Sequence, residues 1–453
     1  MNTKQNIQPQ QPKKSIKEST GLRLVVLGML TLVLMIPISY VNWLIDERQN
    51  NKEQAVREIG RAWGGPVTLA GPILKIPYRH YITYKGSDGE PKRMFKEIRY
   101  FYILPEELQI HTNLQTSTRH KGIYRAVVFR SETGLTGYFK YPNLTGKNIL
   151  PQDILWQSAR WEFIISDGRN LTEKVSIETS GDKPLVFRPD EDQYLQTDFP
   201  VFATKPLGRN LFETSGEIHF RMNLSLKGNK ELNLVPLGKT TRVSMQSDWP
   251  HPSFTGEYLP DNSQKILPNN HGFEAQWKVI EYQRPFKTVY ADRIDLGNMQ
   301  QHRLGVRLLI PVDHYRKTKR TAKYAYLVIF LTFMLFFIIQ QIAHIRMHFF
   351  HYFLVGLALV VFYTLLLSIS EQWNFNAAYA VSALATVGLI GWYARSVLHS
   401  KRFGAQILLG LGLLYTYIFS IVSLQDYALL VGSVGLFIIV AVMMYFSRRI
   451  RWE

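Results

Sequence analysis

The sequence predicts a multi-pass α-helical membrane bundle joined to a β-rich, antiparallel sandwich-like domain outside the membrane. Three observations support this prediction. Residues 324–446 are almost continuously apolar, and a further apolar run covers residues 22–45. The polar segment between them alternates apolar and polar residues with a period of two, which is typical of strands. Lys and Arg are distributed unequally between the two sides of the expected membrane.

Six membrane spans follow from the apolar runs, because about 20 apolar residues are enough to cross a bilayer. The first covers residues 22–45, after a polar, disordered cytoplasmic tail at 1–21. A cleaved signal peptide is the alternative, but the run exceeds the usual apolar core of about 7–15 residues and lacks a small-residue cleavage site. Five further spans form a bundle at 324–342, 352–370, 376–394, 404–424 and 427–446, followed by a cytoplasmic tail at 447–453.

An even number of spans places both termini on one side of the membrane. The tails and short loops on that side carry twelve Lys or Arg residues, whereas the opposite short loops at 371–376 and 424–426 carry none. Positively charged loops stay in the cytoplasm. We therefore predict cytoplasmic termini and, in a bacterial inner membrane, a periplasmic domain at 46–323.

The segment 46–323 begins with a helical pattern at 47–63 and then changes to a strand pattern. Alternation is clean at 217–227, where Ile218, Phe220 and Met222 share one face, and it returns at 272–282. Many short strands separated by Gly, Pro, Asn and Asp predict an antiparallel sandwich. The other expected strands are 67–78, 98–104, 123–129, 135–139, 161–165, 174–177, 185–187, 241–246 and 304–310.

Composition excludes several classes of function. The chain has no cysteine, which removes thiol catalysis, Cys-ligated zinc and iron–sulfur clusters. The net charge of +18 favours anionic partners such as phospholipid headgroups. We expect no nucleic-acid binding, because the domain has neither a basic helix nor a stacking platform. The sequence motifs of hydrolases, zinc proteases and nucleotide-binding enzymes are absent, so we predict no enzymatic activity, no cofactor and no metal.

Five stretches of the sequence together form a recognisable pattern: Trp63-Gly64 with residues 69–78, then 121–124, 247–260, 305–315 and 426–449. In these stretches the sequence resembles the CreD family of inner-membrane proteins. One departure lies at 347–352, where the family usually has His-Pro followed by Gln-Tyr. The resemblance implies six spans, a periplasmic domain, a bacterial inner membrane and a role in envelope integrity or the envelope-stress response. It implies no catalytic residues.

The proline-rich segment 249–260 is the main candidate for recognition. It contains three prolines together with Trp249, His251, Phe254 and Tyr258. Proline restricts the free chain, so less entropy is lost on binding. In this interpretation the segment recognises an envelope protein, lipid or glycan. The alternative, which we favour from composition, is a structural corner between two sheets.

Two further groups of residues lie near the ends of spans. A basic cluster precedes the second span and is expected to contact lipid headgroups, either as a regulated site or as a simple anchor. It consists of Arg316, Lys317, Lys319, Arg320 and Lys323. Ala428, Gly432 and Gly435 share one face of the last span and predict close helix packing, within the bundle rather than between two copies.

Histidines and acids at the membrane boundary give weaker candidates. His344, His348 and His351 fall on one helix face, as metal ligands could, but no carboxylate is near in sequence, so we interpret them as headgroup-layer residues. Glu371 and Asp426 are either a paired acidic site or, as we favour, residues that border water.

The first functional prediction is a non-enzymatic inner-membrane protein that supports envelope integrity or the stress response through its periplasmic domain. The alternative is an envelope transporter or lipid-handling factor with a path through the C-terminal bundle. Active transport is disfavoured because no Asp, Glu, Lys or Arg lies in the middle of the last five spans. An enzyme acting on envelope polymers is the third hypothesis and would need converging carboxylates in a cleft.

Overall fold

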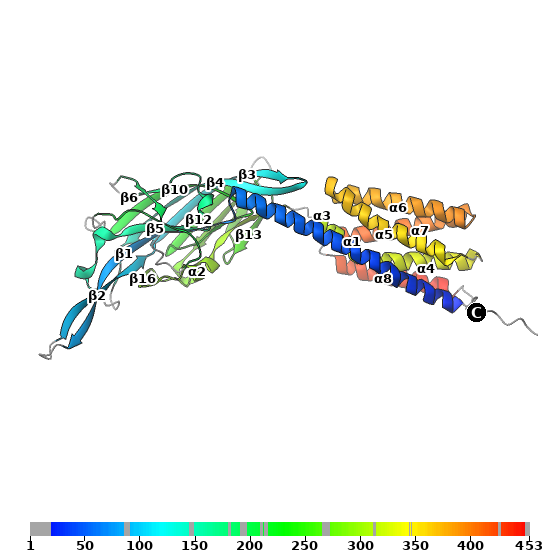
Figure 1. Cartoon of the computed structure of the whole chain (residues 1–453), viewed down its shortest axis with the longest axis horizontal. Coiled ribbons are helices and arrows are strands. Elements are labelled where there is room, and N and C mark those ends of the chain that lie inside the picture. The colour runs from blue at the N-terminus through cyan, green and yellow to red at the C-terminus, as the bar shows by residue number, and fades with distance from the viewer. Residues whose placement is uncertain are drawn as a thin grey trace, which may run out of the picture. The chain divides into compact units, whose positions relative to one another are not determined.

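The chain forms two compact units, Met1–Asn51 with Val312–Glu453 and Lys52–Pro311, called here the membrane unit and the β domain (Figure 1). The computed structural model describes residues 20–85, 91–144, 149–179, 183–190, 197–208, 212, 216–264, 272–310, 314–343, 345, 347–424 and 427–448. The predicted combination of a membrane-helix bundle with a β-rich domain is confirmed.

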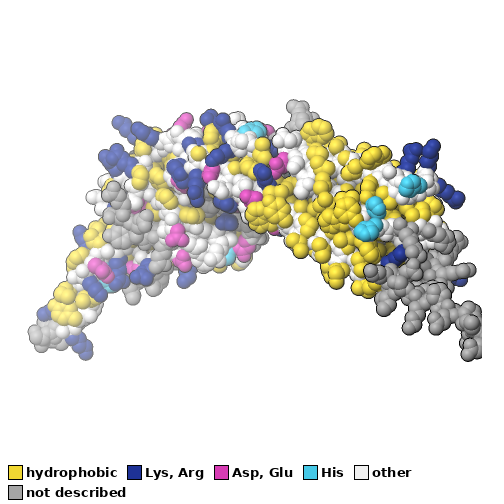
Figure 2. Space-filling view, turned by 45° about the vertical axis from the view of Figure 1, so that its right-hand side comes forward, with side chains coloured by type: hydrophobic (Ala, Val, Ile, Leu, Met, Phe, Trp, Pro, Cys, Tyr) yellow, Lys and Arg dark blue, Asp and Glu magenta, His cyan; other side chains and the backbone are white. Residues whose placement is uncertain are grey.

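Long apolar helices build the membrane unit. Within the described residues, six helices are long and apolar enough to cross a membrane. They are α1 (Thr20–Trp63), α4 (Ala325–Ala343), α5 (Phe349–Gln372), α6 (Phe375–Val397), α7 (Lys401–Ser423) and α8 (Ala428–Ser447). Figure 2 shows hydrophobic side chains covering the visible surface of these helices, as expected where lipid is the solvent.

Two helix boundaries differ from the sequence prediction. The helix expected at 47–63 is not separate, because α1 continues without a break into the β domain. The basic cluster forms its own short helix, α3 (His314–Lys323), which contacts α5, α6 and α7 and so belongs to the membrane unit rather than to the β domain. A local apolar pattern cannot show such a grouping, because α3 is held by tertiary contacts.

The β domain is a sandwich of two sheets. Sheet A has the strand order β13-β17-β11-β1-β5-β9-β8, with β2 paired to β1 and β16 paired to β2. Its strands are β1 (Val67–Lys85), β2 (Pro91–Ile103), β5 (Arg160–Ile165), β8 (Arg188–Pro189), β9 (Val201–Ala203), β11 (Glu231–Leu234), β13 (Pro252–Gly256), β16 (Val289–Ala291) and β17 (Leu304–Leu308).

Sheet B has the order β14-β15-β12-β3-β4-β10-β6-β7. Its strands are β3 (Glu107–Lys121), β4 (Tyr124–Lys140), β6 (Ser176–Thr179), β7 (Leu185–Val186), β10 (Glu217–Asn229), β12 (Thr240–Ser247), β14 (Asn262–Gln264) and β15 (Phe273–Val279). Most strand pairs are antiparallel, as predicted, but the sheets are mixed, because β1 pairs with β11 and β3 pairs with β12 in parallel. Both parallel pairs join strands far apart in the chain, which local alternation does not specify.

A buried hydroxyl cluster explains two errors in the strand prediction. β3 was not expected, and β4 was expected as two strands. Thr112 of β3 occupies an inward position, and its hydroxyl lies 3.2 Å from that of Ser131 and 2.8 Å from that of Thr133, both on β4. These polar residues interrupt the apolar alternation of both strands, but they satisfy one another's hydrogen bonds inside the sandwich.

The main core lies between the two sheets and contains large aromatic side chains. Phe139 of sheet B meets Trp161 of sheet A edge-on, with ring centroids 5.0 Å apart. A second, smaller core covers the opposite face of sheet A. It includes Tyr102 and Ile164 of the sheet and Leu296 of the short helix α2 (Leu296–Met299). The central part of sheet A is therefore buried on both faces.

Candidate functional site

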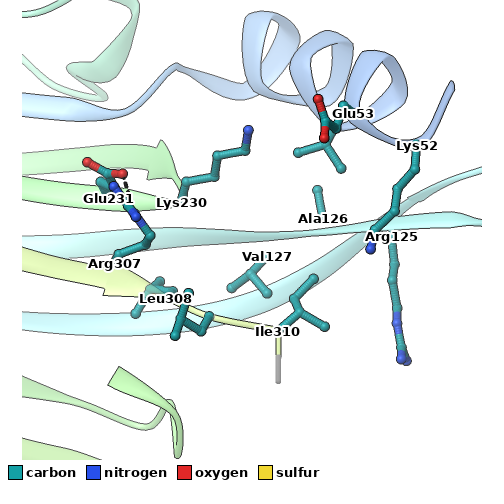
Figure 3. A pocket seen from close by; sticks show the side chains of 12 residues that line it. Lys52, Glu53, Arg125, Ala126, Val127, Lys230, Glu231, Arg307, Leu308 and Ile310 are labelled. Atoms are coloured by element: carbon teal, nitrogen blue, oxygen red, sulfur yellow. Dashed lines mark hydrogen bonds and ion pairs between the residues drawn. The ribbon is translucent and has the colours of Figure 1, made fainter. Parts of the chain in front are cut away.

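A cavity of about 380 Å³, called here the entry pocket, opens where the chain enters and leaves the β domain (Figure 3). Its walls come from the part of α1 that belongs to the domain, the start of β4, the β10–β11 connection and the end of β17. The lining residues are Lys52, Glu53, Val56, Arg125, Ala126, Val127, Lys230, Glu231, Arg307, Leu308, Leu309 and Ile310.

The floor of the entry pocket is apolar. Val127 and Leu308 are buried because both also pack into the main core. Leu309 follows at the surface, with 42% of its area exposed. Val56, Ala126 and Ile310 complete this surface. The pocket can therefore accommodate hydrocarbon.

The rim of the entry pocket is mainly cationic, with four basic and two acidic side chains. Arg307 donates from Nε to Glu231 at 2.6 Å, so these two charges largely neutralise each other. Arg125 and Lys230 are exposed, and within the described part of the chain neither side chain has an ion pair or a hydrogen bond. Figure 3 shows the Lys230 side chain extending toward α1.

Lys230 also has an unusual backbone conformation. Its φ is +61°, in the left-handed region that non-glycine residues rarely adopt. The conformation allows β10 of sheet B to continue directly into β11 of sheet A, and the Lys230 carbonyl accepts from the Leu308 amide at 2.8 Å. The strained turn thus places an ammonium group over the apolar floor.

The proline-rich segment 249–260 is partly a strand. β13 (Pro252–Gly256) pairs with β17 and forms an edge of sheet A. Phe254 points into the sandwich, where its ring meets Phe273 at 5.9 Å and Trp277 at 5.6 Å. This aromatic side chain therefore joins the two sheets, as a structural corner requires.

Trp249 and Tyr258 of the segment make hydrogen bonds to backbone carbonyls of the β domain. Trp249 donates from Nε1 to the Leu309 carbonyl at 2.9 Å, and the Tyr258 hydroxyl donates to the Gln283 carbonyl at 3.0 Å. Both are half-buried, whereas His251 is exposed. Recognition by this segment stays a prediction, with His251 as its most accessible member.

Basic residues on α3 contact other parts of the membrane unit. Lys319 pairs with Asp46, Arg320 donates to the Ile421 carbonyl at 3.5 Å, and Lys317 lies 5.5 Å from the ring centroid of Phe375. Arg316 and Lys323 are exposed. The cluster thus contains residues that attach α3 to the bundle, as well as exposed residues such as Lys323.

Glu371 is not part of an acidic pair in the described structure. It accepts a hydrogen bond from the Tyr315 hydroxyl at 3.1 Å, and its Oε1 lies 3.8 Å from Nε of Arg48. Asp426, its expected partner, lies outside the described residues. Glu371 thus links α5 to α3 and to α1 within the membrane unit, and its pairing with Asp426 stays a prediction.

The histidines at the start of α5 take separate roles. His348 caps α5 by accepting from the Phe350 amide, and Nδ1 of His351 lies 2.7 Å from the Tyr393 hydroxyl. His344 lies outside the described residues. Among the residues that the structure describes, no three His, Asp or Glu side chains form a metal-binding group.

The small residues of α8 face Tyr417 of α7. The Tyr417 hydroxyl donates to the Gly432 carbonyl at 2.8 Å, and its ring occupies the space that a Cβ on Gly435 would need. Ala428 is half-buried one turn earlier on this face. Gly435 and the backbone of Gly432 thus contact α7 within the bundle.

Buried acidic residues of the β domain are neutralised by basic ones. Lys75 Nζ lies 2.9 Å from Glu162 Oε1 and 3.9 Å from Asp190 Oδ2, and Arg160 lies 3.6 Å from Asp190. Burial raises the pKa of Glu162, and the adjacent Lys75 opposes this effect. Since Glu162 has no exposed surface, it is not available to a substrate from solution.

The fold and these sites define a multi-pass membrane protein that carries a mixed β-sandwich between its first two spans. A family model described as "Inner membrane protein CreD" matches residues 19–453. The chain is also 30% identical over 421 residues to "Inner membrane protein CreD" of Escherichia coli (strain K12), which covers 93% of this chain and 91% of that protein. The chain therefore belongs to the CreD family of inner membrane proteins, and the resemblance seen in the sequence is confirmed.

The entry pocket is the site that sequence reasoning missed. Its lining comes from four segments between residues 52 and 310, and each has an ordinary composition. One weak signal exists in hindsight. At 125–127, where β4 starts, and again at 307–310, where β17 ends, an Arg directly precedes a short apolar run.

Proposed function

We propose that this inner-membrane protein is non-enzymatic and supports envelope integrity or the envelope-stress response through a β domain that faces the periplasm. The observation that carries this proposal is the entry pocket, an apolar surface with a cationic rim. Such a site can hold an envelope component, but within the described residues it brings together no nucleophile and base, and no metal-binding group.

Packing inside the bundle supports this proposal over transport through the helices. Phe362 of α5 meets Tyr379 of α6 at 5.6 Å and Tyr415 of α7 at 4.8 Å, all nearly edge-on. All three rings are buried. Aromatic rings therefore fill the space between these helices, where a path for a lipid or solute would have to run.

Cysteine labelling tests the periplasmic orientation directly, because the natural chain has no cysteine. Tyr282, 94% exposed in the β domain, and Lys401, at the start of α7, each suit a single substitution to cysteine. In intact cells, a membrane-impermeant maleimide should label Tyr282→Cys and not Lys401→Cys. Labelling of Lys401→Cys alone would contradict the orientation.

The envelope role is tested by deleting the protein and exposing cells to detergent, bile salts and cell-wall antibiotics. We expect increased sensitivity and leakage of periplasmic protein, both restored by the full-length chain. A deletion strain that matches its parent under all of these stresses would contradict the role. A helix bundle produced without residues 52–311 should not restore resistance if the β domain carries the function.

A further inference from the structure

We propose that the entry pocket binds an anionic phospholipid of the surrounding membrane, with its phosphate between Arg125 and Lys230 and part of an acyl chain on the apolar floor. This inference rests on the proposed function, because it names the envelope component that the domain holds. Two properties of the pocket and its place in the chain lead to this ligand.

The first property is the size and polarity of the cavity. At about 380 Å³ it is near the lower end of the range of roughly 300–1,000 Å³ for small-molecule sites. It can take the headgroup region and the first part of a chain, but not a whole phospholipid. Val56, Leu309 and Ile310 give it an apolar surface that a free inorganic anion would not use.

The second property is the pair of cations, Arg125 and Lys230, that have no partner within the described residues. Arg307 already binds Glu231, so Arg125 and Lys230 are the rim residues best able to meet a phosphate. Lys230 keeps a long basic side chain at a left-handed position where glycine would be less strained. A basic side chain at a strained backbone position supports a binding role.

The chain connections keep the entry pocket within reach of lipid. Lys52 follows the apolar run that ends at Ile45 by seven residues. Even fully extended, seven residues span no more than about 25 Å, and in a helix they rise only about 10 Å. At the other end, Ile310 is close in sequence to α3, which also belongs to the membrane unit. A membrane phospholipid is therefore the anionic amphiphile most available to the pocket.

Photocrosslinking of the full-length protein in lipid nanodiscs tests this inference. The probes are phosphatidylglycerol and phosphatidylcholine, each with a diazirine in one acyl chain, and adducts are located by mass spectrometry. We expect phosphatidylglycerol adducts on peptides containing 125–127 and 307–310, and weak labelling of these peptides by phosphatidylcholine. Unlabelled phosphatidylglycerol should compete, whereas excess inorganic phosphate should not remove the adducts.

Lys230→Gly separates binding from folding. Glycine suits the left-handed backbone, so the thermal midpoint should not fall, while loss of one charge should reduce the adducts by about fivefold. Arg125→Ser should reduce them by a similar factor. Lys278→Ala, at an exposed position of β15, is the matched control and should leave the adducts unchanged.

Several results would overturn the inference. These are equal labelling by the two lipids, unchanged adducts in both rim variants, full competition by inorganic phosphate, or a photoprobe at Leu309 that captures an envelope protein instead of lipid. The lipid inference and the proposed function fail separately. Absent adducts reject the lipid, whereas a deletion strain without an envelope defect rejects the function even if adducts form.

Discussion

The β domain and the membrane unit differ in the burial of their charged residues. The β domain buries Lys75 and Glu162 as a pair, with 1% and 0% of their side-chain areas exposed. The described part of the membrane unit places its pairs, Lys319 with Asp46 and Arg48 with Glu371, at the ends of apolar helices, where most of these side chains reach solvent. Neighbouring strands can surround a buried pair with polar groups, whereas the middle of a bilayer offers neither water nor spare backbone partners.

This difference in burial predicts how much the charged residues of each unit contribute to its stability. Buried charges of the β domain contribute to its stability and uniqueness only as pairs, so breaking one pair should be costly. Charged residues of the membrane unit lie at the ends of apolar helices, and each ion pair should contribute little to the free energy of unfolding. The following predictions test this contrast from the largest expected effect to the smallest.

Glu162→Ala should destabilise the β domain most. It leaves Lys75 buried without its closest partner, which costs about 3–5 kcal/mol. Urea unfolding of the full-length protein in detergent, followed by tryptophan fluorescence, measures the loss. The double variant Lys75→Met/Glu162→Leu is the matched control and should recover most of the stability, because it removes both charges. Equal losses in the single and double variants would contradict the paired-charge interpretation.

Gly435→Ala should weaken the membrane unit. Its added methyl group would overlap the Tyr417 ring, and overpacking of this kind costs about 1–3 kcal/mol. Thermal unfolding in detergent measures the change. Gly432→Ala is the matched control on the same helix. Nothing lies within 4 Å of its new Cβ, so it should be neutral or stabilising. Similar destabilisation by both would mean that α8 does not pack on α7 as described.

Lys319→Ala should have a smaller effect. Lys319 and Asp46 are 38% and 45% exposed, and pairs with this exposure contribute about 0.2–1 kcal/mol. The loss should shrink as salt is raised. The exposed Lys323 of the same helix provides the comparison. Lys323→Ala should reduce stabilisation by anionic lipid while leaving stability in neutral detergent unchanged. If Lys319→Ala alone removes the lipid effect, the division of the α3 cluster is wrong.

Asp167→Asn should have the smallest effect, and the effect should depend on pH. Side-chain hydrogen bonds from Arg169 hold the pKa of Asp167 below its ordinary value. Because the folded-state pKa is lower than the unfolded one, the stabilisation is present above about pH 4 and is lost as pH falls through the folded-state pKa. Wild type should exceed the variant by less than about 1 kcal/mol at pH 7, since the pair is near solvent. In strong acid the two should be equally stable, and a difference that grows in acid would contradict this sign.

Local sequence patterns were sufficient to predict elements that are specified by their own residues. The alternation at 217–227 predicted β10, because each inward residue there is apolar. They failed where inward positions are polar, as at Thr112, Ser131 and Thr133, whose hydroxyl groups satisfy one another only after β3 and β4 pair. The aromatic residues of 249–260 were consistent both with a recognition segment and with a structural corner, because composition alone cannot show that Phe254 points toward Trp277.

The sequence by itself determined that this chain has six apolar helices and a β-rich domain between the first two, because the bilayer sets the length of a span and a half-buried strand sets a period of two. Only the tertiary structure decided the parallel strand pairs, the attachment of α3 to the bundle and the entry pocket. Each of these depends on which distant segments become neighbours. Arg125, Lys230 and Arg307 become neighbours only once α1, β4, β10, β11 and β17 have packed.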